Sequence, residues 1–208
     1  TARWVRDIPI DARGGVAAGA KSVRAVYNEP LPETAPVPTT PVNSPANVEW
    51  TLTGLYGSAT GAGAVEYYDS AGSRKHSAVI DSTTPAALYA RWQRTVGVDG
   101  NGGTVAAGSR SLAVERGIAV PAIAVKGADG QVLVGRDGYE LAGFYSEATG
   151  GSRYFDGNGA PTVLCRDVTV PTTVYAHWKA SPSTIAFDAC GGQGGPSCPC
   201  SACGFLRQ

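Results

Sequence analysis

The chain has 208 residues, of which 17 are Lys or Arg and 17 are Asp or Glu, so its formal net charge is zero. That balance argues against a nucleic-acid partner, which would need a concentrated basic face, and no apolar run approaches the roughly 20 residues that span a bilayer. With 28 Gly and 14 Pro residues, the composition predicts a mainly β fold of short strands and tight turns, with little helix.

The first residues predict a strand that belongs to an earlier part of the protein. Ala2-Arg3-Trp4 repeats the later phrase Ala90-Arg91-Trp92, so we expect residues 1–7 to be the last strand of a preceding repeat. The opening residues do not form the basic and apolar regions of a signal peptide. We therefore expect any export signal to lie upstream.

A strand that ends in a pair of glycines occurs three times. Residues 8–15, 96–103 and 185–192 each alternate apolar side chains and then reach Asp, two variable positions and Gly-Gly or a close variant. This order predicts a strand followed by a tight turn. The three copies lie roughly 85–90 residues apart, much more than the about 20–50 residues of a solenoid repeat. The turn glycines are Gly14, Gly15, Gly102, Gly103, Gly191 and Gly192.

Two aromatic strands joined by a glycine-rich turn follow in residues 52–69 and again in 137–156, where the turn contains Gly150 and Gly151. Each copy closes on a similar phrase, at residues 88–92 and 174–178. Because the aromatic positions recur, we expect them to form a shared core, with a ligand-binding face as the alternative. The expected core aromatics are Trp4, Tyr56, Tyr68, Tyr89, Trp92, Tyr139, Phe144, Tyr145, Phe155, Tyr175 and Trp178.

These repeats divide the chain into modules. We place the first module at 8–92, with a Pro-rich surface loop at 29–45, and the second at 96–178. Residues 183–208 are expected to begin a further repeat and to carry a Cys-rich tail. Ala17–Val26 is a candidate for one short helix, although no segment shows a long 3.6-residue apolar period.

The ordered motifs of residues 96–178 resemble the Listeria–Bacteroides repeat, also called the internalin B-repeat. They comprise Asn101-Gly102-Gly103, Gly138-Tyr139, Gly143-Phe144-Tyr145, Gly150-Gly151 and Tyr175-Ala176-His177-Trp178. Residues 8–92 show the resemblance more loosely. It implies small β-grasp, ubiquitin-like modules in tandem on secreted or surface proteins of bacteria. The family supplies no catalytic residues. The sequence departs from it at Phe144, where the family usually has Trp.

The five cysteines are candidates for disulfides, a metal site or free thiols. Four lie in the tail, and only Cys200 and Cys203 have the Cys-x-x-Cys spacing of a zinc site. A secreted repeat favours disulfides. The odd number leaves one cysteine unpaired or joined to another chain. The disulfide candidates are Cys165, Cys190, Cys198, Cys200 and Cys203.

No catalytic, metal or cofactor site is predicted from the remaining motifs. His177 occupies the position of Arg91 in the earlier copy, which suits a solvated strand face. His76 lies in a polar loop. Asp99-Gly100-Asn101-Gly102 partly resembles a calcium-binding loop, but it lacks the spaced acidic residues and the closing Glu of such a loop. A hairpin turn is therefore the better interpretation.

Three functions fit these observations. The first is a non-catalytic structural stalk or adhesin of an extracellular surface protein, with a host or surface ligand as partner. The second is the subunit of an extracellular fibre, in which copies join head to tail by strand pairing and disulfides. The third is an accessory module of a larger secreted enzyme.

Overall fold

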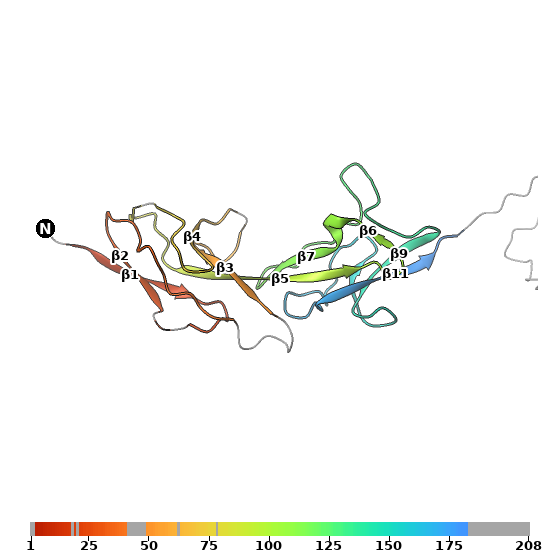
Figure 1. Ribbon diagram of the computed structural model, residues 1–208, viewed down its shortest axis with the longest axis horizontal. Helices are drawn as coiled ribbons and strands as arrows, with labels where there is room; N and C mark the ends of the chain where they lie inside the picture. Colours follow the sequence, from red (N-terminus) through yellow and green to blue (C-terminus); the bar gives the residue numbers. More distant parts are fainter. Residues whose placement is uncertain are drawn as a thin grey trace, which may run out of the picture.

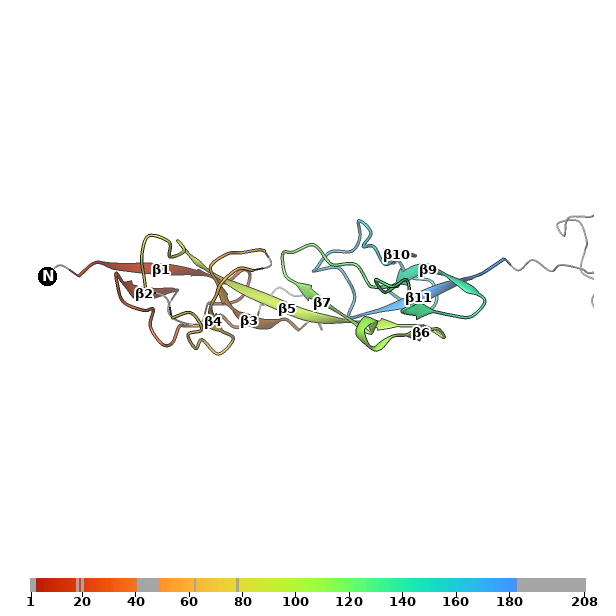
Figure 2. The same ribbon diagram turned by 90° about the horizontal axis from the view of Figure 1, so that it is seen from above.

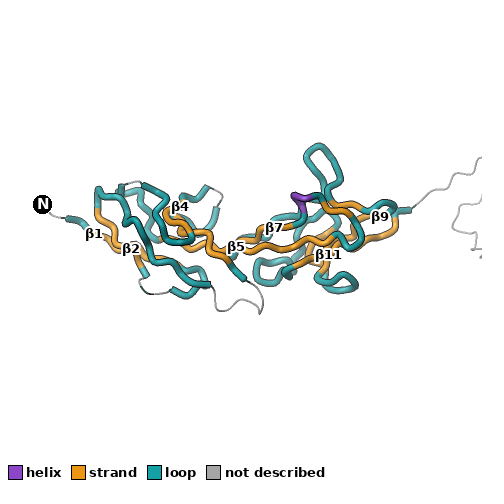
Figure 3. Tube along the Cα trace, in the orientation of Figure 1, coloured by secondary structure: helices purple, strands orange, loops and turns teal. Residues whose placement is uncertain are grey.

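The computed structural model describes residues 3–17, 19, 21–40, 49–61, 63–77 and 79–182. These residues form strands β1–β11 and one short 3₁₀ turn, η1 (Ala107–Ser109), and no α-helix occurs among them. Figure 3 shows the strands and the long loops that join them. The mainly β class that the composition predicts is confirmed.

The N-terminal half of the molecule is built from β1 (Val5–Asp11), β2 (Ser22–Val26), β3 (Thr51–Tyr56), β4 (Glu66–Asp69) and the first part of β5 (Leu88–Asp99). Strand β1 pairs antiparallel with β2 and parallel with the start of β5. Strand β3 lies antiparallel between β4 and β5.

The C-terminal half repeats this plan on the second part of β5. Its further strands are β6 (Thr104–Val105), β7 (Ser111–Glu115), β8 (Val134–Gly135), β9 (Tyr139–Tyr145), β10 (Arg153–Asp156) and β11 (Thr173–Ala180). Strand β7 pairs with β5 as β2 pairs with β1, and β9 lies antiparallel between β10 and β11.

The register of the two halves agrees residue by residue. Ile10 and Asp11 pair with the start of β5, and Val98 and Asp99 pair in the same way with the start of β11. The ladders β3–β5 and β9–β11 even share one irregularity, which falls between Leu52 and Gly54 in the first and at His177–Trp178 in the second. The shared register makes each residue of one half comparable with a counterpart in the other.

Strand β5 runs through both halves and gives the molecule its elongated form (Figures 1 and 2). Its inner face buries every second residue from end to end, namely Leu88, Ala90, Trp92, Arg94, Val96 and Val98. The borders that we placed near residues 92 and 96 therefore fall inside one strand. The expected border between residues 7 and 8 likewise falls inside β1.

The core consists mainly of aliphatic residues around a few large aromatic ones. Trp92, Tyr68, Phe144 and Phe155 are buried, and the last two meet edge to face with ring centroids 6.2 Å apart, as aromatic pairs prefer. The other expected core aromatics Tyr56, Tyr89, Tyr145, Tyr175 and Trp178 are half-buried.

Two of the expected core aromatics are in fact exposed. Trp4 is 75% exposed and Tyr139 is 40% exposed. Both sequence positions match buried counterparts, Trp92 for the former and Trp50 for the latter, but they lie at the two outer ends of the molecule, where the described residues include no neighbouring half to cover them. The prediction that these two residues belong to the core was therefore wrong.

One local expectation was also wrong, and a second was incomplete. The segment expected as a short helix contains β2, in which Val23 and Ala25 point into the core at the alternation of a strand. The described part of the Pro-rich segment, 29–40, is not only a surface loop, because Leu31 is 1% exposed. Its backbone is extended and forms isolated bridges, such as Thr34 with Ser73.

Candidate functional site

The first feature that both halves share is the turn after their opening strand. In the N-terminal half Asp11 Oδ1 accepts the backbone N–H of Arg13 at 2.8 Å, and in the C-terminal half Asp99 Oδ1 accepts that of Asn101 at 2.7 Å. Arg13 and Asn101 have φ angles of 46° and 44° and each is followed by a glycine with φ near 85° (Gly14 87°, Gly102 84°). Two successive positive φ values define the turn type for which Asn-Gly is favoured.

A tryptophan from the closing strand covers each of these turns. Trp92 Nε1 donates a hydrogen bond of 2.9 Å to Ala12 O, and Trp178 Nε1 donates one of 2.9 Å to Gly100 O. The indole rings lie so close to Gly15 and Gly103 that a Cβ on either glycine would overlap the ring. The second glycine of each pair is therefore required by the tryptophan rather than by its own backbone angles.

The exchange of Arg91 for His177 between the two halves has a structural basis. Arg91 lies over the Tyr56 ring, with 4.5 Å from its Cζ to the ring centroid, and His177 stacks on Tyr145 with centroids 4.0 Å apart. His177 Nε2 also lies 2.9 Å from Glu147 O. Both side chains cover the same half-buried tyrosine position, so the geometry accounts for His177 without a role in proton transfer.

The junction between the halves is centred on Arg94, at the midpoint of β5. Its side chain is 5% exposed, and its Nη2 donates to Asp167 O at 2.8 Å and to Val170 O at 2.5 Å. Neither of the two ion pairs among the described residues includes Arg94. Burial lowers the pKa of its guanidinium, an effect that the charges of Asp167 and Cys165 oppose.

Aromatic faces take the place of a carboxylate at this junction. The Cζ atoms of Arg94 and Arg116 lie 5.4 Å and 5.8 Å from the centroid of the Trp50 ring, within the range of cation–π attraction. Trp50 belongs to the N-terminal half and is 2% exposed, whereas Arg116 follows β7 in the C-terminal half. The junction thus joins the two halves through one tryptophan and two arginines.

Sequence reasoning missed this junction. Trp50 precedes β3 and lies outside the aromatic motif, and a charged residue such as Arg94 is rarely buried unless it is paired. The signal that could have found it is the alternation of β5, in which Arg94 falls on the same face as Trp92 and Val96.

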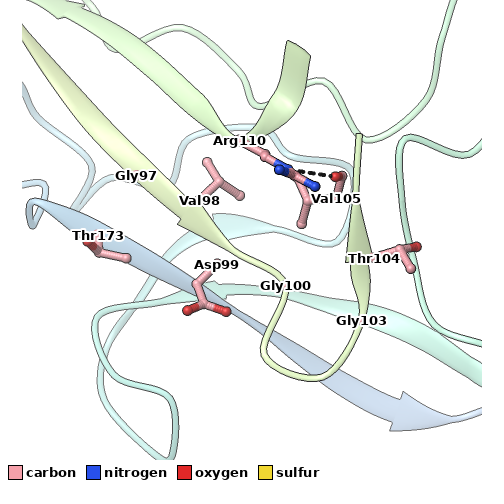
Figure 4. A pocket seen from close by; sticks show the side chains of 9 residues that line it. All are labelled: Gly97, Val98, Asp99, Gly100, Gly103, Thr104, Val105, Arg110 and Thr173. Atoms are coloured by element: carbon pink, nitrogen blue, oxygen red, sulfur yellow. Dashed lines mark hydrogen bonds between the residues drawn. The ribbon is translucent and has the colours of Figure 1, made fainter. Parts of the chain in front are cut away.

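A surface hollow of about 550 Å³ lies beside the turn of the C-terminal half (Figure 4). Asp99, Thr104, Arg110 and Thr173 are the polar side chains around it, and the rest of the lining is Gly and Val. Arg110 Nε donates to Val105 O at 3.2 Å and Asp99 is held by the turn. The hollow presents one carboxylate and one engaged guanidinium, which is not an acid–base pair.

The other candidate ligands behave as follows. Cys165 is a free thiol that is 8% exposed, and burial raises its pKa to about 11 although Arg94 lowers it. A buried thiol of high pKa reacts slowly. Groups of three or more His, Cys, Asp or Glu side chains that could hold a metal do not occur among the described residues. Cys190, Cys198, Cys200, Cys203, Gly191 and Gly192 lie outside the described residues.

The predicted turn between the two aromatic strands β9 and β10 is present. Gly150 and Gly151 form the turn between β9 and β10 with φ angles of 74° and 75°. The described part of the chain includes no helix of the length and hydrophobicity needed to cross a bilayer.

Comparison with known proteins gives no match, whether to a family model, to a curated protein or to a solved structure.

Proposed function

We propose that the chain is a non-catalytic structural segment of a bacterial surface or secreted protein, in which tandem modules act as a stiff spacer. The observation that carries the proposal is β5, which closes one half and opens the next without a break. A strand that is paired along its whole length cannot bend freely as a linker would. An elongated segment of this kind suits the presentation of other domains at a distance.

The junction contacts support the same proposal. Trp50, Arg94 and Arg116 come from both halves and pack against one another at the junction. The resemblance of residues 96–178 to internalin B-repeats, with the β-grasp modules and the extracellular location that it implies, points in the same direction. In both halves the conspicuous polar residues are explained by turns and by aromatic stacking, which leaves them structural roles.

Small-angle X-ray scattering tests the stiffness. The wild-type chain should give one maximum dimension that does not change with ionic strength, because the junction is buried. A matched variant with a short Gly-Ser insertion between Gln93 and Arg94 should show the broader profile of two bodies on a flexible linker. If both proteins scatter as flexible pairs, the spacer function is wrong. Antibody labelling of intact and permeabilised producing cells tests the extracellular location.

A further inference from the structure

The junction between the halves contains buried hydrogen-bond donors that have no acceptor among the described residues. These donors are Trp50 Nε1, Arg94 Nη1 and Arg116 Nη1, and each of the three atoms is shielded from solvent. Trp50 is 2% exposed and Arg94 is 5% exposed. Because native proteins satisfy the great majority of their buried donors, a group of exceptions at one place calls for an explanation, such as a bound ion.

Strand register brings the two arginines to the same place. Arg94 on β5 pairs with Val114 on β7, and Arg116 N donates to Trp92 O along the same ladder (Figure 1). Residues that pair across a ladder project to the same face, and Trp92 and Arg94 share the inner face of β5. Arg94 and Arg116 are therefore diagonal neighbours on one face, and both guanidinium groups lie within 6 Å of the centroid of the Trp50 ring.

Three guanidinium groups and one carboxylate meet at this place. Arg13 Nη2 donates to Arg116 O at 3.3 Å, which adds a third cation to those of Arg94 and Arg116. Asp167 is the acid whose charge acts on Arg94, and its Oδ2 accepts the backbone N–H of Gly117 at 2.8 Å. The described residues therefore give the surroundings of Trp50 an excess of positive charge.

Other groups close to the junction do not balance this excess. Glu115 lies 3.5 Å from Arg91, which belongs to the opposite face of β5. Burial raises the pKa of the Cys165 thiol to about 11, so the thiol carries no charge at neutral pH. Arg6, which corresponds to Arg94 in the N-terminal half, also donates to two backbone carbonyls, but it is exposed and water solvates its charge.

We propose that the junction binds a small monovalent inorganic anion of the size of chloride, held by Trp50 Nε1, Arg94 Nη1 and Arg116 Nη1. Water satisfies N–H donors as well, but only an anion also balances the charge, and a buried charge is costly unless it is paired. A monatomic anion suits a junction of packed side chains because it accepts hydrogen bonds from several directions and needs little room.

The anion would stabilise the contact between the halves, because Trp50 comes from the N-terminal half and both arginines come from the C-terminal half. Strand β5 joins the halves with or without the anion. Binding should therefore change the stability of the molecule and leave its length unchanged. The proposal goes beyond the spacer function and does not depend on it, and the scattering test of the spacer stands whatever the result here.

Urea unfolding in which chloride replaces gluconate, at constant sodium concentration and ionic strength, tests the proposal. Gluconate is too large for a buried site of this kind. A ligand that binds only the folded state multiplies the folded-to-unfolded ratio by one plus its concentration divided by its dissociation constant, so the ratio should rise about elevenfold when chloride reaches ten times that constant. A ratio that does not respond to chloride overturns the proposal.

Three variants separate this site from a general effect of salt. Trp50→Phe keeps the aromatic face but removes one donor, and Arg116→Gln removes a charge from a half-buried side chain. Both should lose most of the response to chloride. The matched control is Arg91→Gln, which removes a guanidinium that also lies over an aromatic ring but on the opposite face of β5, and it should respond like wild type. An equal response in all four proteins overturns the proposal.

Bromide locates the site directly, because it replaces chloride and scatters X-rays anomalously. Crystals of the wild-type chain soaked in bromide should give an anomalous peak within hydrogen-bonding distance of Trp50 Nε1, and crystals of Arg116→Gln should lack that peak. An ordered water or a protein acceptor beside Trp50 Nε1, with no anomalous peak there, overturns the proposal.

Discussion

The guanidinium carbon of Arg94 lies 5.4 Å from the centroid of the Trp50 ring, although the two residues belong to different halves of the molecule. Arg94 is buried without an ion pair among the described residues, and its charge is stabilised by the indole face, two backbone carbonyls and the more distant charge of Asp167. This one side chain therefore stabilises the contact between the halves. Its counterpart is Arg6, which pairs with β2 in the register in which Arg94 pairs with β7, and Arg6 is exposed.

We predict that Arg94→Met lowers the free energy of unfolding by about 2–4 kcal/mol. The substitution removes charge-assisted hydrogen bonds and leaves the buried carbonyl oxygens of Asp167 and Val170 without the donor that they have in the wild type. The matched control is Arg6→Met, which removes similar bonds at an exposed site and should cost less than about 1 kcal/mol. Urea unfolding followed by tryptophan fluorescence measures both. Equal losses would show that the junction adds no stability.

The tryptophans of the closing strands provide a second prediction. Trp92→Ala and Trp178→Ala should each cost about 3–5 kcal/mol, through the cavity and the loss of the hydrogen bond to the turn. The loss at Trp178 is expected toward the lower value because that side chain is only half-buried. Trp4→Ala, at the same place in the motif but 75% exposed, should change the free energy of unfolding by no more than about 0.5 kcal/mol. Thermal unfolding followed by circular dichroism distinguishes these variants, and a large loss for Trp4→Ala would contradict its exposed position.

Gly103 and Gly108 differ in the space that is available for a side chain. A Cβ on Gly103 would overlap the ring of Trp178 and approach Gly135 O, whereas a Cβ on Gly108 meets no atom within 4 Å. Gly103→Ala should therefore destabilise the chain by about 1–3 kcal/mol by overpacking, while Gly108→Ala should be close to neutral. The difference between their melting temperatures measures the effect. Near-neutral behaviour of Gly103→Ala would mean that the indole ring can move away.

Much of this architecture could be predicted from the sequence, because strands and turns leave local signals. The Asp and Gly-Gly order predicted the turns at Gly14 and Gly102, and the alternating aromatics predicted the strands that contain Tyr68 and Phe155. Burial at the ends could not be predicted in this way. Trp4 and Trp92 have the same local sequence, but Trp92 is buried against the turn at Ala12–Gly15, and no such turn lies against Trp4 among the described residues.

The junction could not be predicted for a related reason. Arg94 is buried only because β5 continues from one half into the other. Its charged side chain therefore lies on the inner face of the strand. Trp50 belongs to no repeated phrase, since its counterpart is Tyr139, a different aromatic residue. Register, which depends on pairing between distant strands, was needed to match them.

Alkaline pH provides a fourth prediction. Burial raises the pKa of Tyr68 to about 12 from its ordinary value of 10.0, and its hydroxyl donates to Pro32 O at 3.1 Å. The protonated phenol therefore stabilises the folded state below pH 10, and this contribution is lost as pH rises from about 10 to about 12.

Tyr68→Phe should remove that alkaline loss while costing about 0.5–1.5 kcal/mol at neutral pH for the missing hydrogen bond. The counterpart in the other half is already Phe155, which lacks a hydroxyl. Urea unfolding of both proteins at several values between pH 8 and pH 12 measures the effect. If the difference in stability between wild type and variant is the same at every pH, Tyr68 does not titrate in this range.

The account depends on β5 being one continuous strand that holds both halves together. Hydrogen exchange of the amides in residues 93–97, measured by mass spectrometry on overlapping peptides, tests this most directly. We expect these amides to be protected as strongly as those of residues 88–92, and far more strongly than the exposed loop at 127–131. Exchange of residues 93–97 at the rate of that loop would show a flexible linker between two independent modules.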